Sequence, residues 1–292
     1  MTAVETGVQV LERRHPEWKP WLAVIEEVLA EAANPKWDAV VPVRSERQHG
    51  GIPLLADAIV RIDEPVVGRL LDRLLRIACR SGSPKLATLE PARRAAFDPL
   101  TLFEASLCQQ SDRLEQAAAL LCADPEALQA IAALVPVPFL HACNRRWASV
   151  KSGSWTEGYC PICGAWPTFA EVRGIERSRY FRCGRCGGEW QARCLFCAYC
   201  GMTDHRELAS LLPEKSGASG VIDACKRCLG YVKTFTTLQG TPPAKVLLDD
   251  LATVDFDVAA LEQGYRRPTG PGYQLNLTVA PSGTPYVAGL IP

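Results

Sequence analysis

Four short segments of this 292-residue chain each hold two cysteines separated by two residues: YCPICG at 159–164, RCGRCG at 182–187, FCAYCG at 196–201 and ACKRCLG at 224–230. A tight turn between two such cysteines aims both thiolates at one ion about 2.3 Å away, and a second turn completes a tetrahedral shell. The first two pairs are separated by 19 residues and the last two by 24, at or slightly beyond the usual spacing of four-cysteine metal sites. The pattern predicts two such sites.

Consecutive pairing is favoured over interleaved pairing because the entropy lost on closing a loop grows with its length. The predicted ligands are Cys160, Cys163, Cys183 and Cys186 for one ion, and Cys197, Cys200, Cys225 and Cys228 for the other. Glycine follows the second cysteine at Gly164, Gly187 and Gly201, whereas Gly230 stands two residues after Cys228. Glycine tolerates the positive φ that these turns need, which argues against unliganded or disulfide-bonded pairs.

Nine of the thirteen cysteines fall between 160 and 228. One of them, Cys194, forms an overlapping run with Cys197 and Cys200 that resembles part of a ferredoxin motif, but the fourth cysteine of that motif is missing. We interpret Cys194 as an extra thiol before the third turn, and we do not expect His205 to displace a cysteine ligand. The six remaining candidates lie apart from ligand-spaced companions and are interpreted as structural: Cys79, Cys108, Cys122, Cys143, His49 and His141.

Charge balance and the absence of long apolar runs limit the classes of protein that fit this sequence. Thirty-two basic residues balance thirty-two acidic ones, which gives no electrostatic reason to expect nucleic acid or an anionic membrane as the main partner. The sequence shows neither a secretion signal nor an uninterrupted apolar run of about eighteen residues, so we expect a cytoplasmic location. In a reducing compartment, cysteine-rich segments point to metal rather than to disulfides.

The first half of the chain has helical spacing of its apolar residues. We expect two short helices within 3–33, interrupted by Pro16 and Pro20, and then helices over 52–62 and 65–80. Further helices are expected over 99–122, with Asp98 as its cap, over 125–134, with Asp124 as its cap, and from about 139 to 150.

The residue pattern changes near 152–154: the helical spacing of apolar residues ends, and short runs rich in aromatic and β-branched residues begin. Expected strands are 168–173, 178–182 and 189–193, then 208–212, 221–224 and 231–237, so that two ribbons follow one another. Short helices over 242–251 and 258–263 precede an extended tail over 269–292. The predicted fold class is a multi-domain α+β protein. Its predicted parts are a helical domain (1–154), two four-cysteine domains of rubredoxin or zinc-ribbon type (155–193 and 194–240), and a C-terminal segment (241–292).

Closed four-cysteine sites limit the chemistry. They leave no open coordination position, so they cannot activate water as a catalytic zinc ion does. An all-thiolate tetrahedral site accepts zinc, which would only hold the fold, or iron, which would act as a one-electron centre. The chain also lacks a phosphate loop, a Gly-x-Ser-x-Gly segment and a His-Glu-x-x-His segment, so we do not expect catalysis.

Taken together, the cysteine turns and the end of the chain resemble the FdhE family of formate dehydrogenase accessory proteins. The resemblance is carried by segments at 159–164 (YCPICG), 179–186 (RYFRCGRC) with Glu189 and Trp190, 197–200 (CAYC), 225–233 (CKRCLGYVK), 249–253 (DDLAT) and 262–265 (EQGY). Cys194 departs from the family pattern, in which this position is not cysteine.

The resemblance implies a helical domain followed by two rubredoxin-like domains that bind two ions, iron or zinc. It also implies a cytoplasmic protein that contacts the catalytic subunit of a molybdenum- or tungsten-dependent formate dehydrogenase during its maturation. Neither nucleic acid nor membrane is expected as a partner, and a homodimer is compatible with these expectations. Six residues of the ribbons are candidates for the contact surface, or for the ribbon cores instead: Tyr159, Trp166, Arg179, Tyr180, Trp190 and Tyr199.

Two other classes of protein compete with this interpretation. A zinc-ribbon adaptor or nucleic-acid-binding module would use the same cysteine turns, although the balanced charge weighs against it. A dithiol redox enzyme would use the cysteine pairs directly, but its motif belongs at a strand-to-helix junction.

Overall fold

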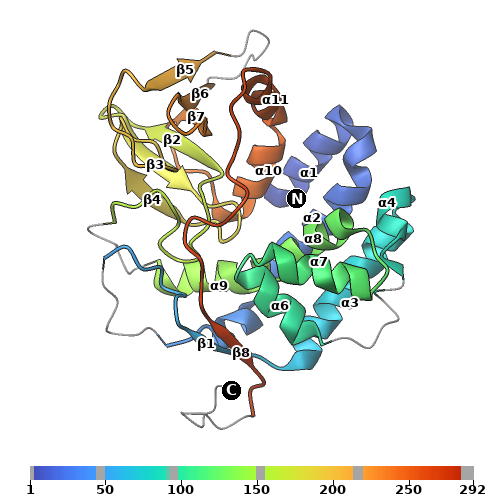
Figure 1. Ribbon diagram of the computed structural model, residues 1–292. Helices are drawn as coiled ribbons and strands as arrows, with labels where there is room; N and C mark the ends of the chain where they lie inside the picture. Colours follow the sequence, from blue (N-terminus) through green and yellow to red (C-terminus); the bar gives the residue numbers. More distant parts are fainter. Residues whose placement is uncertain are drawn as a thin grey trace.

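The computed structural model describes residues 3–43, 50–90, 92, 98–148, 155–212 and 220–283. Helices and a mixed sheet form two adjoining parts, with the helices on one side and the cysteine-bearing strands on the other (Figure 1). The predicted fold class is confirmed: a helical first half is followed by strands and two groups of four cysteines. The predicted domain boundary at 152–154, the loop at 213–219, the tail beyond 283 and His49 lie outside the described residues.

The helical half contains α1 (Ala3–Arg14), α2 (Lys19–Ala32), α3 (Glu64–Arg80), α4 (Pro84–Ala87), α6 (Pro99–Leu107), α7 (Ser111–Leu120), α8 (Pro125–Leu134) and α9 (Val137–Trp147), with 3-10 turns η1 (Pro16–Trp18) and η2 (Pro35–Val40). The two caps are confirmed. Asp98 accepts from the backbone N–H groups of Leu100 and Thr101, and Asp124 accepts from that of Ala127.

The single helix predicted over 99–122 is wrong. The chain leaves α6 after Leu107, and Gln109 adopts a positive φ of 54° before α7 begins at Ser111. No proline or glycine marks this break. Arg185 and Gln274 donate to the carbonyls of Ser106, Leu107 and Cys108, so the C-terminal carbonyls of α6 are satisfied by contacts from distant parts of the chain.

The helix predicted over 52–62 is also wrong. Residues 54–57 form a turn, and Ile59–Arg61 form strand β1, which pairs in parallel with β8 (Thr278–Ala280). The backbone N–H groups of Leu54 and Leu55 donate to Pro161 O and Ile162 O of the first cysteine turn. The partners of this segment are therefore distant in sequence, and a local pattern does not reveal them.

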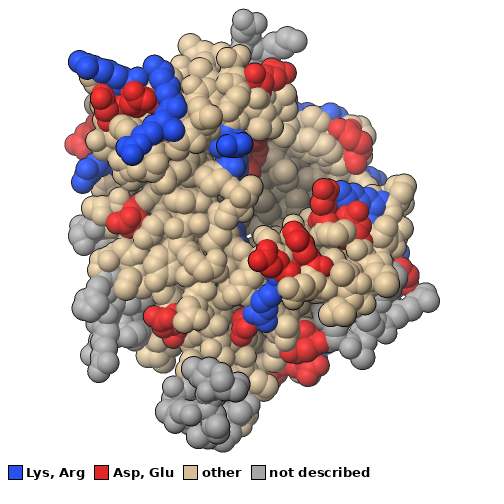
Figure 2. All heavy atoms as spheres, viewed as in Figure 1, with Lys and Arg blue, Asp and Glu red and all other residues tan. Residues whose placement is uncertain are grey.

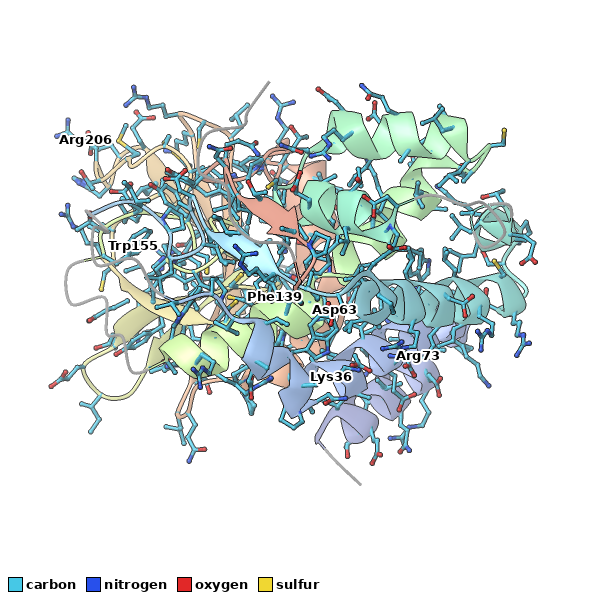
Figure 3. All side chains as sticks on the ribbon, turned by 90° about the horizontal axis from the view of Figure 1, so that it is seen from below. Lys36, Asp63, Arg73, Phe139, Trp155 and Arg206 are labelled. Atoms are coloured by element: carbon cyan, nitrogen blue, oxygen red, sulfur yellow. The ribbon has the colours of Figure 1, made fainter. Side chains whose placement is uncertain are left out.

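Helices α8 and α9 together make the stretch Pro125–Trp147, which is apolar and long enough to cross a membrane by length and composition. Its mean hydropathy is 1.4, and 72% of the tested window is buried inside the protein. Phe139 and Leu140 are fully buried, and Phe139 lies in the interior between the two parts (Figure 3). Packing in the core accounts for its apolar composition.

The six predicted ribbon strands are present as β2 (Phe169–Arg173), β3 (Ser178–Arg182), β4 (Glu189–Ala192), β5 (Leu208–Leu211), β6 (Gly220–Cys225) and β7 (Tyr231–Thr237). They form one sheet in the order β4-β3-β2-β7-β6-β5. Each ribbon is antiparallel within itself, but β2 pairs with β7 in parallel, from Phe169 opposite Lys233 to Arg173 opposite Thr237. The two ribbons thus share a continuous sheet, while the exact domain boundaries stay a prediction.

The end of the chain ties the parts together. After η3 (Pro243–Lys245), α10 (Val246–Leu251) and α11 (Val254–Glu262), the chain runs along the molecule from α11 to β8 (Figure 1). Along the way Arg266 N donates to Leu229 O, Tyr273 N to Gly164 O, and Val279 N to Glu104 Oε2. One large cluster of buried residues extends from the helices through the first ribbon, so these two parts share a core.

Candidate metal centres

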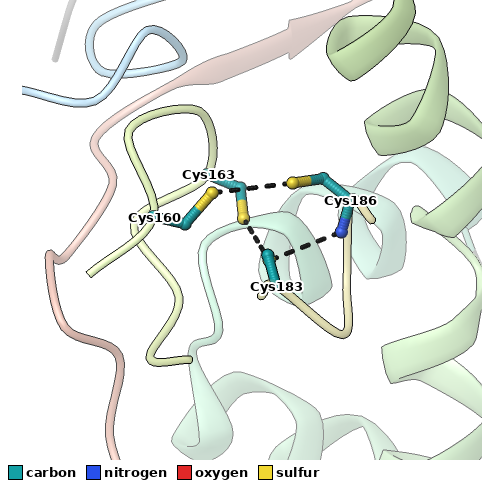
Figure 4. Close-up of side chains that lie close together, drawn as sticks. All are labelled: Cys160, Cys163, Cys183 and Cys186. Atoms are coloured by element: carbon teal, nitrogen blue, oxygen red, sulfur yellow. Dashed lines mark hydrogen bonds between the residues drawn. The ribbon is translucent and has the colours of Figure 1, made fainter. Parts of the chain in front are cut away.

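The first group of four cysteines lies where the first ribbon meets the helices (Figure 4). Cys160 and Cys163 come from the turn before β2, and Cys183 and Cys186 from the turn after β3. Their sulfurs all lie within 4.8 Å of one another, with Cys160 Sγ to Cys186 Sγ and Cys163 Sγ to Cys183 Sγ both at 3.5 Å. All four side chains are buried.

The second group has the same arrangement. Cys197 and Cys200 face Cys225 and Cys228, with Sγ–Sγ distances of 3.6 Å for Cys197 to Cys228 and 3.7 Å for Cys200 to Cys225. A regular tetrahedron with metal–sulfur bonds of about 2.3 Å has edges of about 3.8 Å. Both groups are therefore close to the size of a four-thiolate shell around one ion, and each can hold one. The structure pairs the turns consecutively, as the spacing predicts.

All four cysteine turns share one backbone pattern. The first cysteine donates its N–H to the carbonyl five residues later and accepts from the N–H four residues later, as at Cys183 with Gly188 and Gly187. Backbone N–H groups also point at sulfur, for example Ile162 N to Cys160 Sγ at 3.4 Å and Gly188 N to Cys186 Sγ at 3.4 Å. Such donors stabilise thiolate charge on the ligands.

The residue after the second cysteine has a positive φ in every turn. Glycine occupies it at Gly164, Gly187 and Gly201, with φ of 69°, 70° and 72°. In the fourth turn the residue is Leu229, with φ of 57°, while Gly230 is needed next to it because a Cβ there would lie 2.3 Å from the Tyr199 ring. The fourth turn therefore holds a leucine in a conformation that glycine adopts at lower cost.

Burial shapes the protonation of the first group. The neighbouring thiols of Cys160, Cys163 and Cys186 donate to Cys183 and hold the pKa of Cys183 well below its usual range, whereas burial raises the pKa of Cys160. Without an ion, the thiolate form is therefore easiest to reach at Cys183 and is disfavoured at Cys160. A divalent cation would supply the charge for the other thiols to ionise, so its binding would release protons and weaken at low pH.

Two buried arginines of β3 lie near the two groups. The Arg182 guanidinium, 2% exposed, donates to Gly187 O in the second turn and pairs with Glu189 at 2.6 Å. Arg179 donates to Phe196 O just before the third turn and pairs with Asp223 at 2.9 Å. The side chains at positions 179 and 182 therefore bring positive charge close to each cluster, where a divalent ion with four thiolates would carry a net charge of −2.

The other candidate residues are not members of either group. Cys194 is exposed and outside the second group, although it lines a small pocket beside it with Cys197 and Cys225. His205 has a side chain 73% exposed. His141 is buried in α9, where burial lowers its pKa to about 4 and keeps the ring neutral near pH 7. Cys108 and Cys143 are buried, Cys79 is half-buried, and Cys122 is exposed. The interpretation of the single cysteines as buried residues is therefore right for Cys108 and Cys143 and wrong for Cys122.

Some of the proposed contact residues serve the ribbon interior instead. Arg179 and Trp190 are 4% and 3% exposed, which excludes them from a docking surface. Tyr199 packs edge-on against Trp166 and donates to Tyr231 O. Tyr159 donates to Gly51 O and Tyr180 stacks under Arg173, and both remain half-buried.

A buried charge network was not expected from the sequence. Lys233 on β7 is fully buried and pairs with Asp250 and Asp257, which also bind Arg267. The network fastens α10 and α11 to the sheet. One sequence feature points to the network: Lys233 interrupts the apolar residues of a central strand, where burying an unpaired charge would be costly.

Comparisons with known proteins agree with this arrangement. No family model matches the chain. The FdhE homolog of Pseudomonas aeruginosa is 31% identical over 256 residues, which cover 82% of this chain and 75% of that protein. The FdhE protein of an Escherichia coli O127:H6 strain is 28% identical over 111 residues, 37% of this chain and 35% of that protein.

The fold is also that of a solved structure. The crystal structure of the FdhE protein from Pseudomonas aeruginosa matches with a TM-score of 0.56 and 23% identity, covering 93% of this chain and 94% of that one. The match extends over both the helical half and the ribbons. With the sequence identity over most of both chains, it follows that this protein belongs to the FdhE family.

Proposed function

We propose that this protein is a non-catalytic maturation factor for a formate dehydrogenase, which binds iron or zinc in its two four-cysteine groups and contacts the catalytic subunit of that enzyme. The proposal rests on the resemblance of its cysteine turns to formate dehydrogenase accessory proteins, together with its membership of the FdhE family. Its location would be the cytoplasm.

The geometry of the cysteine groups is the observation that carries the proposal. Each group places four sulfurs within 4.8 Å of one another, close enough for four thiolates to fill the coordination shell of one ion. A shell of this kind offers no position for substrate or activated water. Metal in these sites would hold the ribbons or exchange electrons, which suits an assembly role better than formate oxidation.

The test combines genetics with biochemistry. Deleting the gene from its host is expected to abolish formate dehydrogenase activity while the enzyme polypeptide remains detectable by immunoblot. The intact gene should restore activity, and the purified protein should not oxidise formate. Undiminished enzyme activity in the deletion strain, with no second gene copy, would refute the proposal.

A measurement of metal content completes the test. Protein purified from its own host is expected to carry two ions per chain, identified by elemental analysis, and an iron form would show the absorbance of a four-thiolate ferric site. Variants with serine at Cys160 or at Cys225 should each retain one ion. Full metal content in either variant would show that the ion lies elsewhere.

A further inference from the structure

The second and fourth cysteine turns are structural equivalents with different surroundings. Both follow a sheet strand, and both have the same pair of backbone hydrogen bonds, Cys183 N to Gly188 O with Gly187 N to Cys183 O, and Cys225 N to Gly230 O with Leu229 N to Cys225 O. Arg185 and Arg227 occupy the same position in the two turns, one residue before the last cysteine. A comparison of the two turns therefore shows what an arginine at this position can do.

In the second turn, the arginine docks onto a helix end. Arg185 donates from Nη2 to Ser106 O at 2.6 Å and from Nη1 to Leu107 O at 3.3 Å, at the C-terminus of α6. The carbonyl end of a helix carries partial negative charge, which a guanidinium complements. This turn is also covered at Gly187, where a Cβ would lie 2.6 Å from Pro243.

In the fourth turn, the equivalent groups face solvent. The Arg227 side chain is exposed and forms no ion pair or hydrogen bond with the part of the chain that the structure describes. Leu229, which corresponds to Gly187, is 43% exposed. The ligands differ in the same sense, because Cys200 is exposed and Cys228 half-buried, whereas all four cysteines of the first group are buried.

More exposed cations surround this turn. Lys226 donates to Arg206 O, and Arg266 N donates to Leu229 O, which places these residues beside Arg227. None of the exposed cations Arg206, Lys226, Arg227 and Arg266 pairs with a carboxylate among the described residues. Figure 2 shows Lys and Arg side chains gathered at the corner of the second ribbon, with a few carboxylates among them, and Arg206 extends outward at the edge in Figure 3.

Leu229 supplies an independent indication. A non-glycine residue at positive φ is strained relative to the right-handed region, and the other three turns avoid this strain with glycine. Its side chain lies largely outside the core, so packing within the protein does not explain the leucine. Strained residues of this kind concentrate at binding surfaces.

We propose that the fourth cysteine turn is the docking surface for the partner enzyme, with Arg227 bound to an electronegative protein surface and Leu229 in apolar contact beside it. The electronegative surface is a group of carboxylates or the carbonyl end of a helix, as Arg185 binds within this chain. This inference rests on the proposed function for the identity of the partner. A protein surface fits better than nucleic acid because Leu229 and the nearby exposed Leu195 are apolar, and Asp204 and Glu207 lie among the cations.

The experiment measures binding of the full-length, metal-loaded protein to the purified formate dehydrogenase catalytic subunit of its host. Arg227→Glu is expected to weaken binding by about tenfold or more, the scale of a close charge pair across an interface. Arg69→Glu, an exposed arginine of α3, is the matched charge-reversal control and should bind like wild type. Metal content should be unchanged in both.

Leu229→Gly separates docking from folding. Its melting temperature is expected to equal or exceed that of wild type, because glycine relieves the backbone strain, while its affinity for the subunit falls. A purely structural role for Leu229 would change stability without changing affinity. Weaker binding of the wild-type protein at higher salt would further support the electrostatic contact.

The outcomes distinguish the two proposals. Wild-type affinity in both Arg227→Glu and Leu229→Gly overturns the docking surface and leaves the proposed function intact. An active enzyme in the deletion strain, with no binding of the subunit, refutes the proposed function, and the inference falls with it. Tight binding of poly(U) RNA or a random-sequence DNA duplex that is lost in Arg227→Glu would overturn the choice of a protein partner.

Discussion

Replacing Cys183 by serine tests whether the first group is a metal site that holds the fold. A structural four-ligand ion contributes an apparent binding free energy of about 10 to 16 kcal/mol, so one ligand accounts for about 3 kcal/mol if the four share it equally. Cys183 is fully buried, so no water can replace the lost thiolate without opening the protein. For a chain of 292 residues that unfolds as one unit, about 3 kcal/mol corresponds to a decrease of about 5 °C in melting temperature.

Cys79→Ser is the control for this experiment. Cys79 is half-buried in α3, and its thiol donates to Leu86 O at 3.8 Å, a weak bond whose loss costs little. We expect a loss of about 1 kcal/mol or less. Melting temperature by scanning calorimetry and metal content by elemental analysis are measured on the same samples. Equal decreases in the two variants, with the wild-type metal content in both, would refute a metal that holds the fold.

Three further predictions follow from the structure. A thiol-competing chelator should remove metal in two phases, and the faster phase should come from the second group, which is more exposed. Cys200→Ser should abolish the fast phase. A single phase of metal release from the wild-type protein would contradict this prediction. Lys233→Met should destabilise the protein by about 1.5 to 3 kcal/mol in urea, because Asp250 and Asp257 lose the buried one of their two cations and keep only Arg267, whereas the exposed Lys19→Met should be nearly neutral. Glu31→Gln should destabilise the protein at pH 7. Burial opposes ionisation of Glu31, but hydrogen bonds from Lys36 and Trp37 lower its pKa below 4.5. The ionised carboxylate therefore contributes to the free energy of unfolding above pH 4.5, and this contribution is lost as the pH falls through the lowered pKa. A difference between Glu31→Gln and wild type that stays constant on acidification would disprove the role of the ionised carboxylate.

The parts of the fold that the sequence predicted are those decided by neighbouring residues. Cysteine turns close through hydrogen bonds that span four or five residues, and the caps at Asp98 and Asp124 act within three. The ribbons were found for the same reason, since each hairpin joins consecutive strands.

The parts that the sequence did not predict depend on distant partners. The parallel pairing of β2 with β7 joins Phe169 to Lys233, and β1 pairs with a strand more than two hundred residues later. The break between α6 and α7 is fixed by Arg185 and Gln274, and the burial of Arg179 follows from carbonyls just before the third turn and from Asp223. Such contacts leave no local periodicity, and within their own segments Arg179, Arg185 and Lys233 look like ordinary surface charges.

The different surroundings of the two groups suggest different duties for the two ions. The first group is built into the shared core, and its turns hold the helical half directly, through Ile162 and Pro161 to the segment at 54–55 and through Arg185 to α6. Loss of that ion would release the turn geometry on which these contacts depend, and so would loosen the join between ribbon and helices. In the described structure, no helix packs against the fourth turn of the second group. Loss of its ion would therefore change the conformation of Arg227 and Leu229 at the surface while the core stays packed. Under the docking proposal, the first ion would set the stability of the protein and the second the conformation of the docking surface, so variants of the two groups should fail in different assays.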